Sequence, residues 1–190
     1  ELIASHLDGF VTRRDQRLMI FVQPRGGKSE LVSRRLPAYI LGRDPDAAII
    51  ATSYGADLAR SMNRDVQRII DGDEYRRLFP ETQLWGKNVR SMADGSYLRN
   101  SDMFEVVGHR GYYLSAGVGG PITGRGARYM IIDDPSKNRK EASSPTYQQA
   151  IYEWYTSTFY TRLAPGGNIL IVLTRWHESD LAGRLLAAAK

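Results

Sequence analysis

The sequence predicts an α/β fold in which a mostly parallel central sheet is flanked by helices. Short, continuous apolar runs are typical of strands that are buried on both faces of a parallel sheet. Longer stretches with helical periodicity lie between these runs, and such alternation is typical of layered α/β proteins. The expected strands are Leu18–Val22, Ala47–Thr52, Phe104–Val107, Tyr129–Ile132 and Ile169–Leu173.

The segments between the strands carry helix signals. Lys28–Leu41 follows a glycine-bearing loop and ends at turn-forming residues. Ser144 is an expected N-cap before a helix that begins at Pro145, and a last helix is expected from about Ser179 to the chain end. Asp57–Ile70 is amphipathic, with an apolar face of Leu58, Met62, Val66 and Ile69 and an opposite stripe of Arg60, Arg64 and Arg68.

Composition places the chain among globular proteins. Its 190 residues, 42% of them hydrophobic, predict one domain over 1–190. No apolar run approaches the roughly 20 residues that span a bilayer, so no membrane association is expected. The absence of cysteine excludes disulfides and thiolate metal sites, and the net charge of +5 is compatible with a polyanionic partner. Because the sequence does not start with Met and stops inside a helix, we expect a trimmed start and a further domain or linker beyond its end.

A phosphate-binding loop follows the first strand, at Val22-Gln23-Pro24-Arg25-Gly26-Gly27-Lys28-Ser29. Glycines let consecutive backbone amides point at an anion, the lysine ammonium reaches the outer phosphates, and the serine hydroxyl can bind magnesium. The standard Walker A pattern has glycine at the position of Val22, so this loop is a variant.

Paired acids follow the fourth expected strand. Asp133 at the end of a buried strand is a Walker B arrangement, which delivers a carboxylate to the magnesium shell. Asp134 would then orient or deprotonate the attacking water. Thr174 follows the last strand in the same way, where a polar side chain can sense the γ-phosphate; a plain turn residue is the alternative.

Other candidates carry weaker signals. Arg125 lies between Gly124 and Gly126 in a loop predicted to be mobile, and it can act as an arginine finger. The group His177, Glu178 and Asp180 has no standard metal spacing, and an acidic helix N-terminus explains it better. The arginine stripe can meet a phosphate backbone, although a solvated helix face is the favoured interpretation.

Together, these motifs resemble the large terminase subunit of tailed bacteriophages, in its N-terminal ATPase domain. The resemblance rests on the Walker A loop followed by Glu30, on Gly124-Arg125-Gly126, on Ile131-Ile132-Asp133-Asp134-Pro135 and on Thr174-Arg175-Trp176-His177. Family members lack the first Walker A glycine and carry an arginine in the loop. Many have glutamate where this chain has Asp134.

The resemblance implies a RecA-like P-loop NTPase fold of the ASCE type, without the C-terminal nuclease domain. It implies nucleotide binding by Gln23, Arg25, Gly26, Gly27, Lys28, Ser29 and Thr174, and magnesium binding by Ser29 and Asp133. The implied catalytic residues are Asp134, Arg125 and Arg25, with Arg125 acting on a neighbouring subunit's nucleotide and Arg25 able to act in cis.

The family's activity is MgATP hydrolysis coupled to packaging of double-stranded DNA into a procapsid during virus assembly. Implied partners are DNA, the portal protein, the small terminase subunit and further copies of the chain in a pentamer, although the isolated domain can be monomeric. The implied location is the host cytoplasm. The alternatives are a RecA-like helicase or translocase, a small-molecule kinase, and a DNA-binding module with an inactive P-loop.

Overall fold

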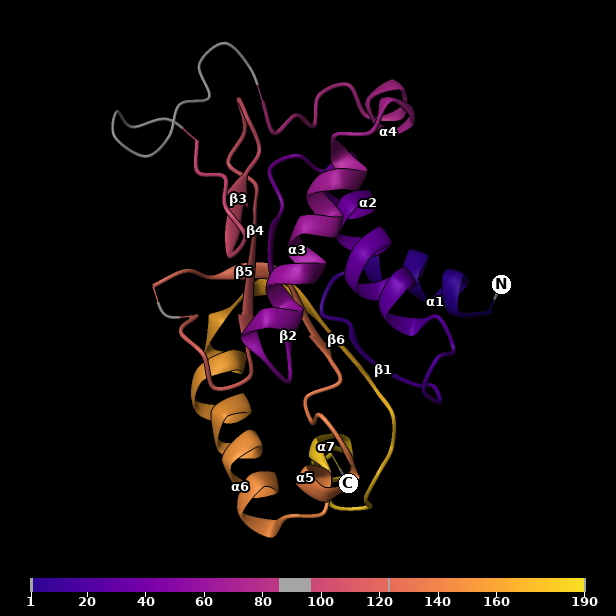
Figure 1. The fold of residues 1–190 in the computed structure, drawn as a ribbon, viewed down its shortest axis with the longest axis vertical. Helices are drawn as coiled ribbons and strands as arrows, with labels where there is room; N and C mark the ends of the chain where they lie inside the picture. The colour runs from indigo at the N-terminus through magenta and orange to yellow at the C-terminus, as the bar shows by residue number, and fades with distance from the viewer. Residues whose placement is uncertain (1, 86–96, 123, 190) are drawn as a thin grey trace.

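The protein is described by a computed structural model that covers residues 2–85, 97–122 and 124–189. Within these ranges a six-stranded sheet has the order β1-β6-β5-β2-β4-β3, with β3 antiparallel to β4 and the other pairs parallel (Figure 1). The strands are β1 (Arg17–Phe21), β2 (Ala48–Ser53), β3 (Met103–Glu105), β4 (Tyr112–Gly117), β5 (Ala127–Asp133) and β6 (Leu163–Leu173).

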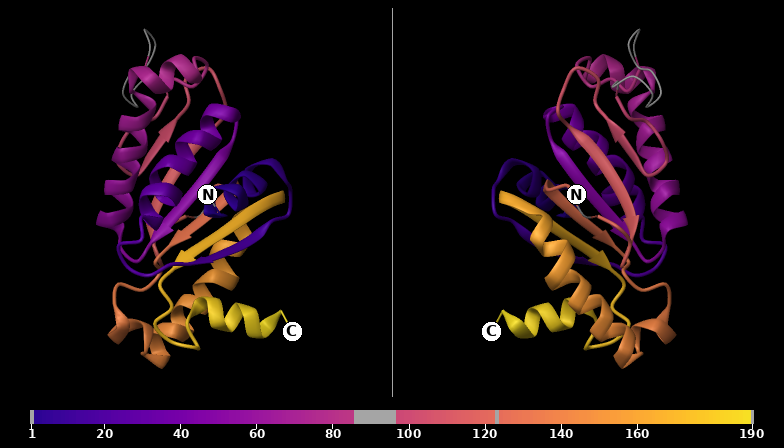
Figure 2. Two further views of the ribbon diagram at one scale, coloured as in Figure 1. Left: turned by 90° about the vertical axis from the view of Figure 1, so that its right-hand side faces the viewer. Right: turned by 90° about the vertical axis from the view of Figure 1, so that its left-hand side faces the viewer.

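Helices cover both faces of this sheet (Figure 2). They are α1 (Leu2–Thr12), the π-helix η1 (Glu30–Arg35), α2 (Leu36–Arg43), α3 (Ala56–Ile70), α4 (Asp73–Leu78), α5 (Arg139–Ala142), α6 (Pro145–Trp154), the π-helix η3 (Tyr155–Phe159), the 3-10 helix η4 (Tyr160–Arg162) and α7 (Leu181–Ala188). None of the helices in the described ranges is long and apolar enough to cross a membrane.

The two hydrophobic cores follow from the alternation of side chains along the strands. On β5, Tyr129 and Ile131 face a core shared with α1, η1, α2 and α3, whereas Met130 and Ile132 face a core shared with α6, η3 and α7. Both sets are buried, which explains why Tyr129–Ile132 of β5 is a continuous apolar run. The predicted α/β class is therefore confirmed.

Each expected strand overlaps a strand of the sheet, although Val106 and Val107 lie beyond the end of β3, and β4 was not predicted. Its sequence ends in serine, alanine and glycine, which weakens the apolar signal. Ser115 is nevertheless buried, because its hydroxyl accepts a hydrogen bond from Asn63 of α3 at 3.1 Å. The strand thus depends on a polar partner that is distant in sequence.

The buried face of α3 differs from the expected one. Leu58 and Ile69 are only partly buried, while Asn63 and Gln67 point inward. The side-chain amide of Gln67 donates to Asn63 Oδ1 at 2.7 Å, so these buried polar groups satisfy one another. The expected helix over Lys28–Leu41 also differs, because it is divided into the π-helix η1 and the α-helix α2.

Three strands end side by side at one edge of the sheet. Phe21 of β1 pairs with Leu173 of β6, and Val172 of β6 pairs with Asp133 of β5. The loops that follow β1, β5 and β6 therefore meet at the carboxyl edge, where open α/β sheets bind their ligands.

Candidate nucleotide-binding site

The loop after β1 is shaped by close packing between Val22 and Gly26. A Cβ atom on Gly26 would lie 2.5 Å from Val22 Cγ1, so only glycine fits there while valine occupies position 22. Gly27, with φ of +76°, and Arg25, with φ of +63°, turn the backbone through the left-handed region. The valine that departs from the standard pattern is therefore part of the loop's own packing.

Lys28 joins the three loops at the carboxyl edge. Its ammonium group lies 2.8 Å from Asp134 Oδ2 and donates to Thr174 Oγ1 at 3.2 Å. Thr174 in turn donates its backbone N–H to Asp134 Oδ1 at 2.9 Å and its hydroxyl to the Val22 carbonyl at 3.1 Å. The side chain of Lys28 is only 8% exposed, so its charge is compensated inside the protein.

Asp134 reaches Lys28 because its backbone takes up an unusual conformation. Its φ is +46°, which aspartate tolerates better than most residues with a side chain. The carboxylate is thereby turned toward both Lys28 and the Thr174 amide.

Asp133 is buried beside this network, with 2% of its surface exposed. Its Oδ2 accepts a hydrogen bond from Ser33 Oγ at 2.6 Å, while Oδ1 is buried and accepts none from the described residues. Burial raises the pKa of Asp133, although the hydroxyls of Ser33 and Ser29 favour the ionised form. A buried carboxylate oxygen with no protein partner, next to a serine hydroxyl, fits the oxygen ligands that magnesium prefers.

A protein-family comparison agrees with this geometry. The family described as terminase large subunit, T4-like-virus type, N-terminal, matches residues 20–187. The chain belongs to this family. It is thus a member of the N-terminal domains of terminase large subunits.

A solved structure shows the same fold. The crystal structure of the HK97 bacteriophage large terminase is similar with a TM-score of 0.58 and 13% identity, covering 92% of this chain and 32% of that chain. The large terminase ATPase domain of Thermus phage P74-26, in a mutant form, is similar with a TM-score of 0.45 and 16% identity, covering 85% and 61%. No curated protein matches the chain. The terminase domain thus spans about a third of the HK97 protein, and the likeness to that protein confirms the RecA-like fold.

All the predicted site residues except Arg125 lie on or beside the three loops at the carboxyl edge of the sheet. Lys28, Asp134 and Thr174 are in direct contact, and Ser29 lies beside Asp133. Gln23 and Arg25 are exposed on the same loop.

Arg125 lies at the end of the sheet where the parallel strands β2 and β4 begin, opposite the carboxyl edge. Its guanidinium group is 3.6 Å from the carboxylate of Glu105 and lies over the ring of Tyr112, 5.1 Å from the centroid. Tyr112 is the first residue of β4 and pairs with Ala48, the first residue of β2. Arg125 is therefore remote from Lys28 of its own chain.

The interpretation of His177, Glu178 and Asp180 as a helix start is confirmed. Asp180 caps α7 by accepting a hydrogen bond from the Gly183 amide at 3.0 Å, and it pairs with Arg175 at 2.8 Å. Across the described part of the chain, no three acidic, histidine or cysteine side chains are grouped to hold a metal ion.

Two side chains of the arginine stripe on α3 are held by carboxylates. Arg60 pairs with Asp102 at 2.6 Å and Arg68 with Asp65 at 2.7 Å. These pairs support the solvated-face interpretation over a phosphate-binding one.

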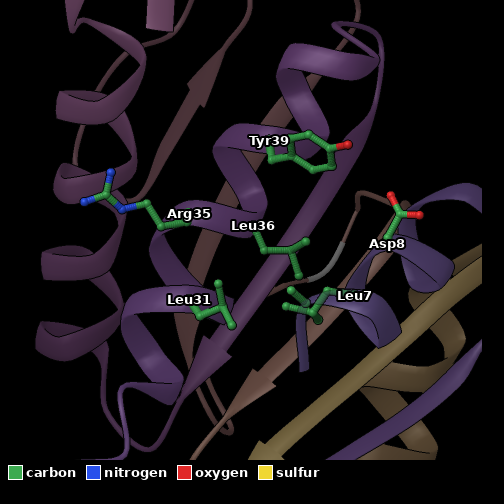
Figure 3. A pocket seen from close by; sticks show the side chains of 7 residues that line it. Leu7, Asp8, Leu31, Arg35, Leu36 and Tyr39 are labelled. Atoms are coloured by element: carbon green, nitrogen blue, oxygen red, sulfur yellow. The ribbon is translucent and has the colours of Figure 1, made fainter. Parts of the chain in front are cut away.

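A separate groove of about 350 Å³ lies between α1 and the η1–α2 segment (Figure 3). Leu31 and Leu36 point toward Leu7 of α1 across this groove, and its surface is mostly apolar. None of the residues predicted to bind nucleotide lines it. The groove is therefore not part of the site around Lys28.

Ser33 is the site residue that sequence reasoning missed. It lies four residues after Ser29, so a helix places both hydroxyls on the same side, which was the available signal.

Proposed function

We propose that this terminase domain binds and hydrolyses MgATP. The observation that carries the proposal is the convergence on Lys28: its ammonium group contacts both Asp134 and Thr174, while the buried Asp133 lies beside Ser29. A lysine, two carboxylates and a serine at the carboxyl edge of a parallel sheet match the parts of a P-loop NTPase site.

The loop from Gln23 to Ser29 would hold the phosphates. Backbone amides of Gly26, Gly27 and Lys28 at the start of a helix favour negative charge, and the Lys28 ammonium adds a full positive charge. Ser29 and Asp133 would hold magnesium, which neutralises charge on the transferred phosphoryl group.

Asp134 is proposed to position the attacking water. In the structure Lys28 occupies Oδ2, and the Thr174 amide holds Oδ1. When Lys28 binds a phosphate instead, Oδ2 is released while the bond to Thr174 still fixes the carboxylate. This arrangement supplies an oriented acceptor for the water proton, although aspartate reaches less far than the glutamate found in many terminases.

The two candidate arginines would act from different chains. Arg25 is exposed on the nucleotide-binding loop, so it can approach phosphate in cis. Arg125 lies far from Lys28 of its own chain, so its proposed role requires a neighbouring copy. Either guanidinium would stabilise negative charge in the transition state.

The family relationship supports a motor role for this activity. We propose that the domain works within a pentamer on the portal of a procapsid, together with the small terminase subunit, in the host cytoplasm. Thr174 contacts both Lys28 and Asp134, so loss of phosphate would change its surroundings directly. Such a change can be passed to surfaces that grip double-stranded DNA, because differential binding shifts conformational populations.

The test is ATP turnover by wild type, Lys28→Ala and the matched control Lys140→Ala, whose lysine is exposed and outside the site. Lys28→Ala should reduce turnover by about 100-fold or more, as expected for loss of a transition-state charge contact. Lys140→Ala should keep wild-type turnover. Equal turnover by Lys28→Ala and wild type would refute the proposed site, and no turnover by the wild type on capsids would indicate an inactive P-loop.

A further inference from the structure

Ser33 is a buried hydroxyl whose only side-chain partner in the described residues is an acid of the site. It is 1% exposed and lies in η1. Its Oγ donates to Asp133 Oδ2 at 2.6 Å, a short bond of the kind made to an ionised acceptor.

The two carboxylates of the site have separate supports. Asp134 is held by Lys28 and by the Thr174 amide, whereas Asp133 is held through Ser33 from η1. The bond to Ser33 occupies Oδ2 and leaves Oδ1 without a partner in the described residues. A carboxylate that is anchored by one oxygen cannot rotate freely, so the open oxygen has a defined direction.

The π-helical geometry of η1 sets where Ser33 lies. The Leu36 N–H bonds to the Leu31 carbonyl, five residues back, which is the spacing of a wide π turn. Such turns are rare in proteins, but those that occur are often found at functional sites. Here the widened turn contains Ser33 directly after the nucleotide-binding loop.

We propose that Ser33 is a positioning residue that orients Asp133 for magnesium. By holding Oδ2, it presents Oδ1 beside Ser29, where the cation of MgATP would bind; this inference rests on the proposed function. Small cations with strict octahedral geometry depend on such fixed ligands, and loss of an outer partner typically weakens metal affinity or activity about 10- to 100-fold.

The experiment compares Ser33→Ala with Ser33→Thr, which keeps the hydroxyl, and Ser33→Val, which matches threonine in shape without it. Ser115→Ala is the control, because Ser115 is also buried but its hydroxyl bonds to Asn63 of α3 and to the Asp102 carbonyl, away from the site. For each protein, binding of a fluorescent, non-hydrolysable ATP analogue is measured with and without Mg²⁺, together with the Mg²⁺ midpoint of ATP turnover and the melting temperature.

Loss of the hydroxyl should act on magnesium specifically. We expect Ser33→Ala and Ser33→Val to raise the Mg²⁺ midpoint about 10- to 100-fold and to reduce the Mg²⁺ enhancement of analogue binding. Affinity without Mg²⁺ should stay within about twofold, and Ser33→Thr and Ser115→Ala should resemble wild type in Mg²⁺ dependence.

Three results would overturn the inference. The first is an unchanged Mg²⁺ midpoint in folded Ser33→Ala, and the second is an equally raised Mg²⁺ midpoint in Ser33→Thr and Ser33→Val. The third is that only Ser33→Thr folds among the three variants, because the hydroxyl would then be needed for stability. Absence of analogue binding by the wild type would instead contradict the proposed function itself.

Discussion

Replacing Gly26 by alanine tests the packing that distinguishes this loop from a standard P-loop. The added Cβ would lie 2.5 Å from Val22 Cγ1 and 3.2 Å from the Gln23 carbonyl oxygen. The backbone of Gly26 is not in the left-handed region, so alanine adds a steric contact and little conformational strain. Overpacking of this kind typically costs about 1–3 kcal/mol, and we expect the free energy of unfolding to fall by that amount.

A second substitution should relieve the contact. Val22→Ala removes Cγ1, so the double variant Val22→Ala/Gly26→Ala should be more stable than the sum of the single effects predicts. Residues in direct contact show coupling energies of about 0.5–3 kcal/mol, and a value of about 1–2 kcal/mol is expected here.

Gly27→Ala is the matched control. Gly27 has φ of +76° and nothing within 4 Å of an added Cβ, so its alanine variant is strained by conformation and not by contact. The cost should be about 1–2 kcal/mol, and Val22→Ala should not reduce it. Urea denaturation followed by circular dichroism gives the free energy of unfolding of all six proteins. These are the wild type, the three single variants and the double variants Val22→Ala/Gly26→Ala and Val22→Ala/Gly27→Ala. Additive effects of Val22→Ala and Gly26→Ala would refute the packing argument.

Three further predictions concern the scaffold and the second arginine. Asn168→Ala should lower the free energy of unfolding by about 3 kcal/mol, because the buried amide bonds to three backbone groups in 10–16 and their loss leaves polar groups unsatisfied; a change below 1 kcal/mol in urea denaturation would contradict this. Burial raises the pKa of Asp65, but the bonded guanidinium groups of Arg34 and Arg68 together outweigh it, so the net shift of the pKa is downward from 3.8. The stabilisation by ionised Asp65 is then fully present above pH 3.8 and is lost as the pH falls through the lower pKa of the folded state. Asp65→Asn should therefore lower the free energy of unfolding by about 1 kcal/mol at pH 7 and leave it unchanged in strong acid. A difference between wild type and variant that does not depend on pH would refute the assignment. Mixed oligomers of Arg125→Ala and Lys28→Ala subunits should regain ATP turnover on capsids if Arg125 acts across a subunit contact, and no regain would exclude that role.

Much of the fold could be predicted because its strands are buried on both faces. Within β5, Tyr129–Ile132 is an uninterrupted apolar run, since both faces of the strand contact helices. By contrast, β4 was not predicted, because the buried hydroxyl of Ser115 accepts its hydrogen bond from Asn63 of α3, which is distant in sequence. The local sequence pattern around Ser115 gives no sign of that hydrogen bond. The division of Lys28–Leu41 into a π-helix and an α-helix is likewise a result of packing, and periodicity does not reveal it.

The grouping of the candidate site residues could be predicted where residue type and position after a strand coincide. Lys28, Asp134 and Thr174 each follow a strand of the same sheet, so adjacency of the strands brings them together. The left-handed backbone of Asp134 and the bond from Ser33 to Asp133 depend on three-dimensional geometry, which the sequence does not display.

The central claim is that three loops form one MgATP site around Lys28. A crystal structure of the protein with Mg²⁺ and a non-hydrolysable ATP analogue tests it most directly. We predict phosphates against the loop that ends at Ser29, the Lys28 ammonium moved from Asp134 to phosphate, and Asp133 beside the cation. A nucleotide bound elsewhere, such as in the groove between α1 and α2, with Lys28 still paired to Asp134, would contradict the claim.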